Sequence, residues 1–190
     1  MILAGLGNPG DRYKETRHNI GFQVVALIAE RWGRPLFQDK FRSHFATAAL
    51  AGGGRVYLQK PQTFMNVSGD AVQPAAAFYK VSPADILVIH DELDLPFGRV
   101  ALKKGGGSGG HNGLKSLTQR LGTPEFLRLR VGIGRPPAEF RGQVADYVLQ
   151  RFSAEEASQL PEILLKSAEA VDLLLDKGLA EAMNRVNRKK

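Results

Sequence analysis

Cysteine is absent from this chain of 190 residues. Its absence excludes a disulfide framework, a cysteine-ligated zinc site and a thiol nucleophile. It also fits a reducing compartment such as the cytoplasm, where we expect the protein to act. No apolar run approaches the roughly 20 residues that a membrane-spanning helix requires. The opening segment Met1–Ala4 lacks the basic start of a secretion signal, so no such signal is expected.

The remaining composition is that of an ordinary globular chain. Apolar residues make up 43% of it and charged residues 24%. No repeat, low-complexity linker or change of composition marks a boundary, so residues 1–190 are expected to form one domain. A chain of this length buries roughly 70% of the surface that it exposes when unfolded, without disulfides or metals.

Acidic residues are scarce in one part of the chain. The formal net charge is +7 over the whole sequence. Residues 99–135 contain eight basic side chains and one acid, Glu125, so this segment alone accounts for the excess. Such clustering is typical of a protein that binds a polyanion, although a solvated face with scattered lysines gives the same pattern.

Short apolar runs alternate with helical patterns, which predicts an α/β fold with a sheet between helices. Strands are expected at 1–6, 45–50, 55–60, 86–89, 100–103 and 127–133, and helices at 19–31, 68–79 and 112–121. A hairpin turn is predicted at glycines 52–54. After the capping pair Ser153 and Glu156 the chain reads as helical, with interruptions at Pro161 and near Gly178. Pro74 should kink its helix or delay its start.

Glycine-rich segments imitate the dinucleotide-binding fingerprint twice. The first match is 5–10, directly after a predicted strand. The fingerprint requires a helix at its last glycine and an acid at a strand end about 20 residues later. Residues 11–17 read as polar turns instead, and Glu30 falls on a helix. The second match, at 105–110, is what any glycine-dense loop produces, so a nucleotide site is not predicted.

The second glycine-rich segment also fits a nucleophile elbow, with Ser108 at its centre. An esterase of that kind needs an acid and a histidine further along the chain. The only later histidine is His111, which is too near in sequence for that arrangement. A serine esterase therefore stays an alternative, to be tested with Ser108→Ala.

Polar side chains follow several predicted strands. Asn8, Asn66, Asp91 and Asn112 each lie just beyond a strand end, and His18 stands where the first loop meets the first helix. Ligands of open α/β sheets bind outside the carboxyl ends of the strands, so these residues could converge. A histidine oriented by a carboxylate, with amides nearby, can activate water for hydrolysis. Alternatively the asparagines are caps or turn residues, His18 begins a helix, and Asp91 is one of several metal-binding acids.

Five blocks of the sequence resemble bacterial peptidyl-tRNA hydrolases, in order, between residues 3 and 136. The blocks are Gly5–Gly10 with Tyr13, Thr16–Asn19 and Gly21; Pro61 with Thr63–Asn66, Ser68 and Gly69; His90–Asp94 with Pro96 and Gly98; Gly109–Leu114; and Arg130–Pro136. Each block is only moderately specific, but together they are highly specific. Ser108 departs from the pattern, because some members of the family have histidine there.

The resemblance implies a monomeric cytoplasmic enzyme with a twisted, mixed, mostly parallel sheet flanked by helices and a helical C-terminal third. It implies hydrolysis of the ester that joins a stalled peptide to its tRNA, without a metal or other cofactor. In this scheme His18 takes a proton from water, and Asp91 orients His18. Asn8, whose amide can donate and accept, reads the peptide backbone beside the ester and separates blocked from free aminoacyl-tRNA.

The resemblance also implies the residues that hold the substrate. The expected partner is the acceptor arm and 3′ terminus of the tRNA, with no membrane and no obligate protein partner. A rival is an RNA-binding protein that has this fold and has lost hydrolysis, as in plant organelle splicing factors that resemble the family. The intact Asn8, His18, Asp91 and Asn112 argue against it. The substrate-binding residues implied by the resemblance are Tyr13 and Phe64 for the terminal nucleotides, Asn66, His111 and Asn112 for substrate and water, and Lys103 and Arg130 for phosphate.

Overall fold

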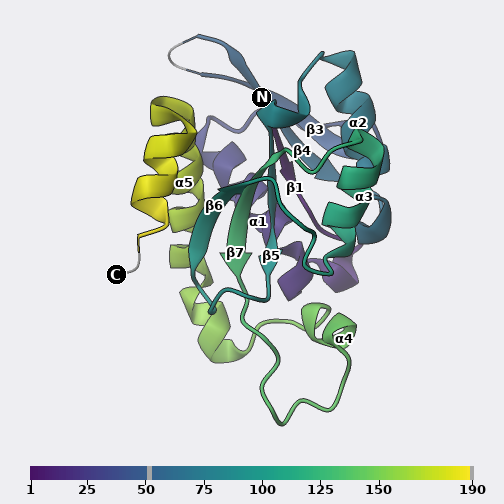
Figure 1. Ribbon diagram of the computed structural model, residues 1–190, viewed down its shortest axis with the longest axis vertical. Coiled ribbons are helices and arrows are strands. Elements are labelled where there is room, and N and C mark those ends of the chain that lie inside the picture. The colour runs from purple at the N-terminus through teal and green to yellow at the C-terminus, as the bar shows by residue number, and fades with distance from the viewer. Residues whose placement is uncertain (51–52, 189–190) are drawn as a thin grey trace.

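The computed structural model describes residues 1–50 and 53–188, and within them one twisted sheet of seven strands forms the centre (Figure 1). The strands β4, β1, β5 and β7 are parallel, whereas β2 and β3 continue one side and β6 the other in antiparallel fashion. In spatial order they are β2 (Gln38–Lys40), β3 (Ser43–Ala49), β4 (Arg55–Pro61), β1 (Ile2–Gly5), β5 (Ile86–Glu92), β7 (Leu127–Gly132) and β6 (Val100–Lys104). The predicted α/β fold with a mixed sheet and a parallel centre is confirmed.

Helices cover both faces of the sheet. The long helix α5 (Ala154–Val186) packs beside α1 (Ile20–Arg31) on one face, and α2 (Gly69–Phe78) packs beside α3 (Asn112–Leu121) on the other (Figure 1). A short helix, α4 (Val144–Val148), lies beneath the lower end of the sheet. Among the described residues, no helix combines the length and the apolar character that a bilayer span requires.

The two faces of the central strands explain the unbroken apolar runs of the sequence. Side chains alternate along a strand, so Leu87 and Ile89 of β5 face α1 while Ile86 and Val88 face the α2 and α3 layer. All four are fully buried. A strand that is covered on both sides needs apolar residues at every position, as the run predicted.

Two glycines bring the start of α1 directly against the strand ends. A Cβ atom on Gly21 would lie 2.3 Å from the carbonyl oxygen of Ile89, and one on Gly5 would lie 2.3 Å from that of Gly21. Any larger residue would push the helix away from β1 and β5. The residues that precede α1 therefore lie over the carboxyl end of the sheet, and His18 is among them.

The C-terminal turn of the chain covers the outer edge of β6. The side chain of Asn187 accepts from the amide of Leu102 and donates to its carbonyl, both at 2.8 Å. Arg99 donates to the backbone carbonyls of Asn187 and Arg188. The outward N–H and C=O of Leu102 thus have partners although no strand lies beside β6 among the described residues.

The helical interruption predicted at Pro161 is wrong, and Pro74 does not delay the start of its helix. The helix α2 begins at Gly69 and runs through Pro74, and α5 runs through Pro161. Both side chains are exposed, so water can reach the carbonyl group that each proline leaves without an N–H partner. The predicted break near Gly178 is confirmed, because that residue has φ 77° and ψ 172°. The turn residue Gly52 lies outside the described residues.

Candidate active site

A cavity of about 680 Å³ opens at the carboxyl end of the parallel strands, beside α4. The structure brings most of the predicted site residues to its wall. Those that line it are Asn8, His18, Phe64, Asn66, Asp91, His111 and Asn112. Tyr13, Lys103 and Arg130 are not among its lining residues.

Two histidines share one oxygen of Asp91. Nδ1 of His18 lies 2.8 Å from Oδ1 of Asp91, and Nε2 of His111 lies 3.0 Å from the same atom. His18 belongs to the short 3₁₀ helix η2 (Arg17–Asn19) before α1, whereas Asp91 lies near the end of β5. The predicted pairing of a histidine with a carboxylate from another part of the chain is thus present in the geometry.

The backbone at the start of α3 fixes the protonation of His111. Nδ1 of His111 accepts from the amides of Gly113 and Leu114, so it must present a lone pair. The proton of the neutral ring is then on Nε2, where it is donated to Asp91. With both nitrogens engaged, His111 orients the carboxylate and is not free to exchange protons with a substrate.

His18 has the opposite tautomer. Its Nδ1–H donates to Asp91, which leaves Nε2 with a lone pair and without a partner among the described residues. Burial alone raises the pKa of Asp91, but the adjacent His18 and His111 outweigh it and hold that pKa well below its usual range. Asp91 is therefore ionised at every pH at which a histidine titrates. This arrangement can activate a water molecule at Nε2 of His18.

The sequence left open that Asp91 is a metal-binding acid, and the donor atoms of His18, Asp91 and His111 lie within 4.8 Å of one another. A metal ligand must offer a lone pair. Because the α3 amides occupy the lone pair of His111 Nδ1, its Nε2 carries a proton and could bind a cation only as imidazolate. The tautomers therefore fit a hydrogen-bonded network around Asp91 and do not fit a metal site.

Asn8 presents only one half of its amide to the cavity. Its Oδ1 accepts from the backbone amide of Met65 at 2.8 Å, so the Nδ2 donor is left for a ligand. The backbone N–H and carbonyl of Asn8 are both bonded at 2.9 Å by the side chain of Asn19. The sequence alone indicated no role for Asn19. Its position one residue after His18 was the available signal.

The remaining predicted residues surround the cavity in different ways. Asn66 and Asn112 are exposed on its wall. Phe64 is 53% exposed, and its ring meets that of Tyr13 edge to face with centroids 6.5 Å apart. These two aromatic rings form an apolar rim next to the cavity.

Lys103 and Arg130 lie on β6 and β7, away from the cavity wall. Lys103 is exposed, whereas Nε of Arg130 is paired with Glu92 at 2.8 Å. Between them on the same face is the buried Arg128, which donates to the carbonyl groups of Gly106 and Gly107. Arg128 thereby fixes the glycine-rich loop that reaches the cavity at Ser108. In the sequence, Arg128 is marked only as one charge of the basic segment 99–135.

Comparison with known proteins shows which family has this sequence and fold. The family model of peptidyl-tRNA hydrolase matches residues 2–190. The chain belongs to this family. The peptidyl-tRNA hydrolase of Chloroflexus aggregans is 49% identical over 187 residues and 98% of both chains. That of Mycobacterium marinum is 50% identical over 192 residues, which cover 98% of this chain and 97% of that one. The resemblance found in the sequence is confirmed.

Solved structures agree with this membership of the peptidyl-tRNA hydrolase family. The crystal structure of peptidyl-tRNA hydrolase from Acinetobacter baumannii matches this one with a TM-score of 0.90 at 38% identity. The match covers 100% of this chain and 95% of that chain. The fold, including the long C-terminal helix, is thus that of the family.

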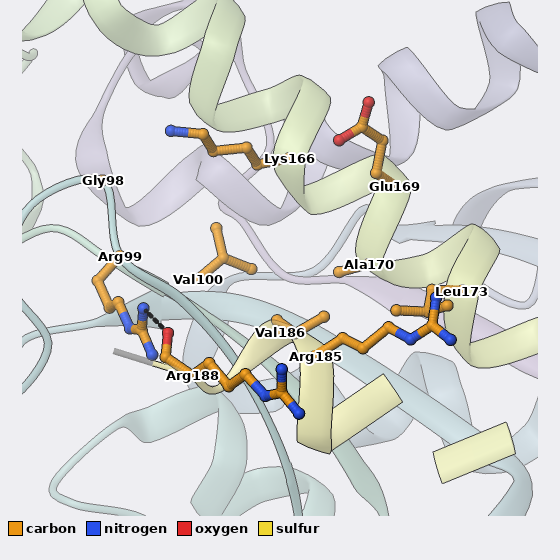
Figure 2. Close-up of a pocket in the computed structure, with 10 residues that line it drawn as sticks. All are labelled: Gly98, Arg99, Val100, Lys166, Glu169, Ala170, Leu173, Arg185, Val186 and Arg188. Atoms are coloured by element: carbon orange, nitrogen blue, oxygen red, sulfur yellow. Dashed lines mark hydrogen bonds between the residues drawn. The ribbon is translucent and has the colours of Figure 1, made fainter. Parts of the chain in front are cut away.

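A second cavity, of about 640 Å³, lies between α5 and the start of β6 (Figure 2). Apolar side chains and several cations line it, namely Val100, Ala170, Leu173, Val186, Arg99, Lys166, Arg185 and Arg188. Lys166 and Arg185 are each paired with a glutamate one helical turn away. Arg99 is engaged with the end of α5. Two of the four cations thus have a carboxylate partner, and Glu169 adds an acid to the lining of this cavity.

A buried histidine of this site makes stability depend on pH. Burial and, after it, the adjacent His111 lower the pKa of His90 to about 3. Its Nδ1–H donates to the backbone carbonyl of Asp91, and its Nε2 is buried without a partner among the described residues. In the unfolded chain the same ring takes up a proton near pH ~6.5. The unfolded state therefore binds more protons, and the free energy of unfolding falls as the pH drops from about 6.5 toward 3.

We expect His90→Asn to weaken this dependence, because an asparagine Nδ2 can replace Nδ1 and does not titrate. The slope of unfolding free energy against pH between pH 6 and 4 should fall by up to about 1.4 kcal/mol per pH unit. Denaturant titrations at several pH values measure it, with the half-exposed His44 changed to asparagine as control. An unchanged slope in His90→Asn would contradict the assignment.

Proposed function

We propose that this chain hydrolyses the ester bond of peptidyl-tRNA with a water molecule that His18 activates. The observation that carries the proposal is the free Nε2 of His18 in a ring whose Nδ1–H is held by the ionised Asp91. Membership of the peptidyl-tRNA hydrolase family supplies the substrate. We further propose that the enzyme acts as a monomer in the cytoplasm.

The reaction needs one base and one carbonyl-binding donor. His18 Nε2 takes a proton from water while the water oxygen attacks the ester carbon. Asn8 Nδ2 donates to a carbonyl oxygen of the bound peptide and holds it in place. When the tetrahedral intermediate collapses, the ribose oxygen leaves and takes the proton from the imidazolium. The products are the free peptide acid and tRNA with an intact terminal hydroxyl group.

The substrate-binding residues follow from the same proposal. Phe64 and Tyr13 offer rings on which unpaired nucleotides can stack, and stacking tolerates any sequence. Asn66 and Asn112 offer amides to substrate and water at the cavity wall. Lys103 is free to contact phosphate, and Arg130 keeps its outer guanidinium nitrogens without a partner among the described residues.

The decisive experiment is incubation of the purified protein with an N-blocked aminoacyl-tRNA, with and without a chelator. We expect release of the blocked amino acid at the same rate in both. Binding of the tRNA without release would favour an RNA-binding protein that does not hydrolyse. Loss of release in Ser108→Ala would favour the serine esterase.

Asn8 should set the preference for blocked substrates. A side-chain N–H donor suits a peptide carbonyl and is repelled by the free ammonium of an unblocked aminoacyl-tRNA. Asn8→Ala should reduce the ratio of kcat/KM between blocked and unblocked substrates about 10-fold, the effect of about 1.4 kcal/mol. Asn184→Ala, an exposed change on α5, serves as control. An unchanged ratio would remove Asn8 from recognition.

A further inference from the structure

The residue before His18 carries a buried positive charge that the reaction does not use. The guanidinium of Arg17 is enclosed, with its side chain 7% exposed. Nη2 donates to Oε2 of Glu156 at 2.5 Å, and Nη1 donates to the backbone carbonyl of Arg151. The two terminal nitrogens of the guanidinium thus bond two different residues, both more than 130 positions away in the chain.

The contacts of Arg17 lead to the end of α4, to the start of α5 and to the residues between these two helices. The guanidinium lies over the rings of Tyr147, at 4.5 Å from its centroid, and Phe152, at 5.2 Å. The backbone amide of Arg17 donates to the carbonyl of Gln150, and Thr16 forms a β-bridge with Arg151. Side chain and backbone therefore fasten the 3₁₀ helix η2 to residues 147–156.

That segment is also a wall of the active cavity. Val144, Val148 and Leu149 of α4 and its end line the cavity together with His18. Val144 is 46% and Leu149 40% exposed, so apolar surface faces the space in which a peptide would lie. On the other side of His18, Asn19 fastens η2 to Asn8. His18 is thus held between two anchors, one of which belongs to the cavity wall.

We propose that Arg17 is a positioning residue that locks the His18 ring to the α4 wall, so that base and wall move as one body. The inference rests on the proposed function, in which His18 is the base. Without the guanidinium, η2 keeps its backbone links to Gln150 and Arg151 and its bonds through Asn19, but it loses the side-chain link to Glu156, so the His18 ring is held less firmly against Asp91. Lysine cannot replace the guanidinium, because it has a single ammonium group.

The test separates this role from a contribution to stability alone. Arg17→Met keeps an unbranched apolar side chain and removes the guanidinium that lies over Tyr147 and Phe152. Arg151→Met makes the same change at an exposed arginine nearby that pairs with Glu15. Well below the unfolding temperature, we expect Arg17→Met to lower kcat about 10-fold with KM within about 2-fold of wild type. Arg17→Lys should be nearly as slow, and Arg151→Met should be unaffected.

A second readout needs no substrate. In the folded wild type, ¹⁵N-resolved NMR of the ring should show His18 with its proton on Nδ1, and Arg17→Met should show a mixture of tautomers. If Arg17→Met does not fold, Glu156→Gln weakens the same contact and should give an intermediate loss on both readouts. A folded variant with normal kcat and an unchanged His18 tautomer overturns the proposal. If the wild-type protein itself lacked the proposed activity, the proposed function would be wrong, and the NMR comparison would still show whether Arg17 positions the His18 ring.

Discussion

Replacing His18 with alanine is expected to lower kcat at least about 10²-fold, the smallest contribution usual for a general base. The free Nε2 of His18 accepts the proton of the attacking water, and among the described residues no other group at the cavity offers a lone pair with a matched carboxylate behind it. Affinity for tRNA should stay close to wild type, because the proposed phosphate contacts lie on β6 and β7. Single-turnover kinetics and a separate tRNA-binding assay measure the two effects.

The chain contains a natural control for this change. His44 lies 3.5 Å from Asp39 on an exposed part of the sheet, so it repeats the histidine–carboxylate pair without the cavity. His44→Ala should leave kcat unchanged. Near-normal turnover of His18→Ala, purified free of host hydrolase, would exclude His18 as the base.

Replacing Asp91 with asparagine should be nearly as damaging. The carboxylate oxygen accepts from His18 and His111 at once, and an amide can offer such an oxygen only while its NH₂ group points elsewhere. The charge that stabilises the imidazolium of His18 is also lost. We expect kcat to fall about 10²-fold or more, within the range of acid–base contributions. Asp39→Asn is the matched control.

The pH profile gives an independent check on this pair. Because the pKa of Asp91 is held far below its usual range, the acid limb of wild-type activity reflects protonation of histidine and not of this carboxylate. Activity should therefore rise with pH across that limb. In Asp91→Asn the limb should move to lower pH, since the charge that favours the imidazolium is gone. An unmoved limb would show that Asp91 does not act on the base.

The sequence predicted those parts of the molecule that depend on local patterns. The strand β5 is buried on both faces, which explains its unbroken apolar run. The helix α3 is buried on one face, which explains its alternation of polar and apolar residues. The positions of the expected strand ends indicated which polar residues could come together at the carboxyl edge of the sheet. The 73-residue separation between His18 and Asp91 could be bridged only by the topology, in which β5 lies beside β1.

Other features had no local signal. The helix α4 is five residues long and follows a stretch of glycine, proline and charge, so no periodicity marks it. The buried role of Arg17 depends on Glu156, and a sequence shows neither the burial nor the partner. Both ring nitrogens of His111 are engaged because this residue lies at the start of α3, and the sequence shows neither the α3 amides nor Asp91 next to the ring.

The contacts that Asn187 makes with the edge strand β6 affect how readily copies of this protein associate with one another. An uncovered edge strand offers its free N–H and C=O groups as a template for another chain, which leads to aggregation or domain swapping. At this edge the amide and carbonyl of Leu102 are occupied by Asn187, and at the opposite edge β2 has only three residues. We expect a chain cut before Asn187 to leave the amide and carbonyl of Leu102 open to another strand, and so to associate with its own copies more readily.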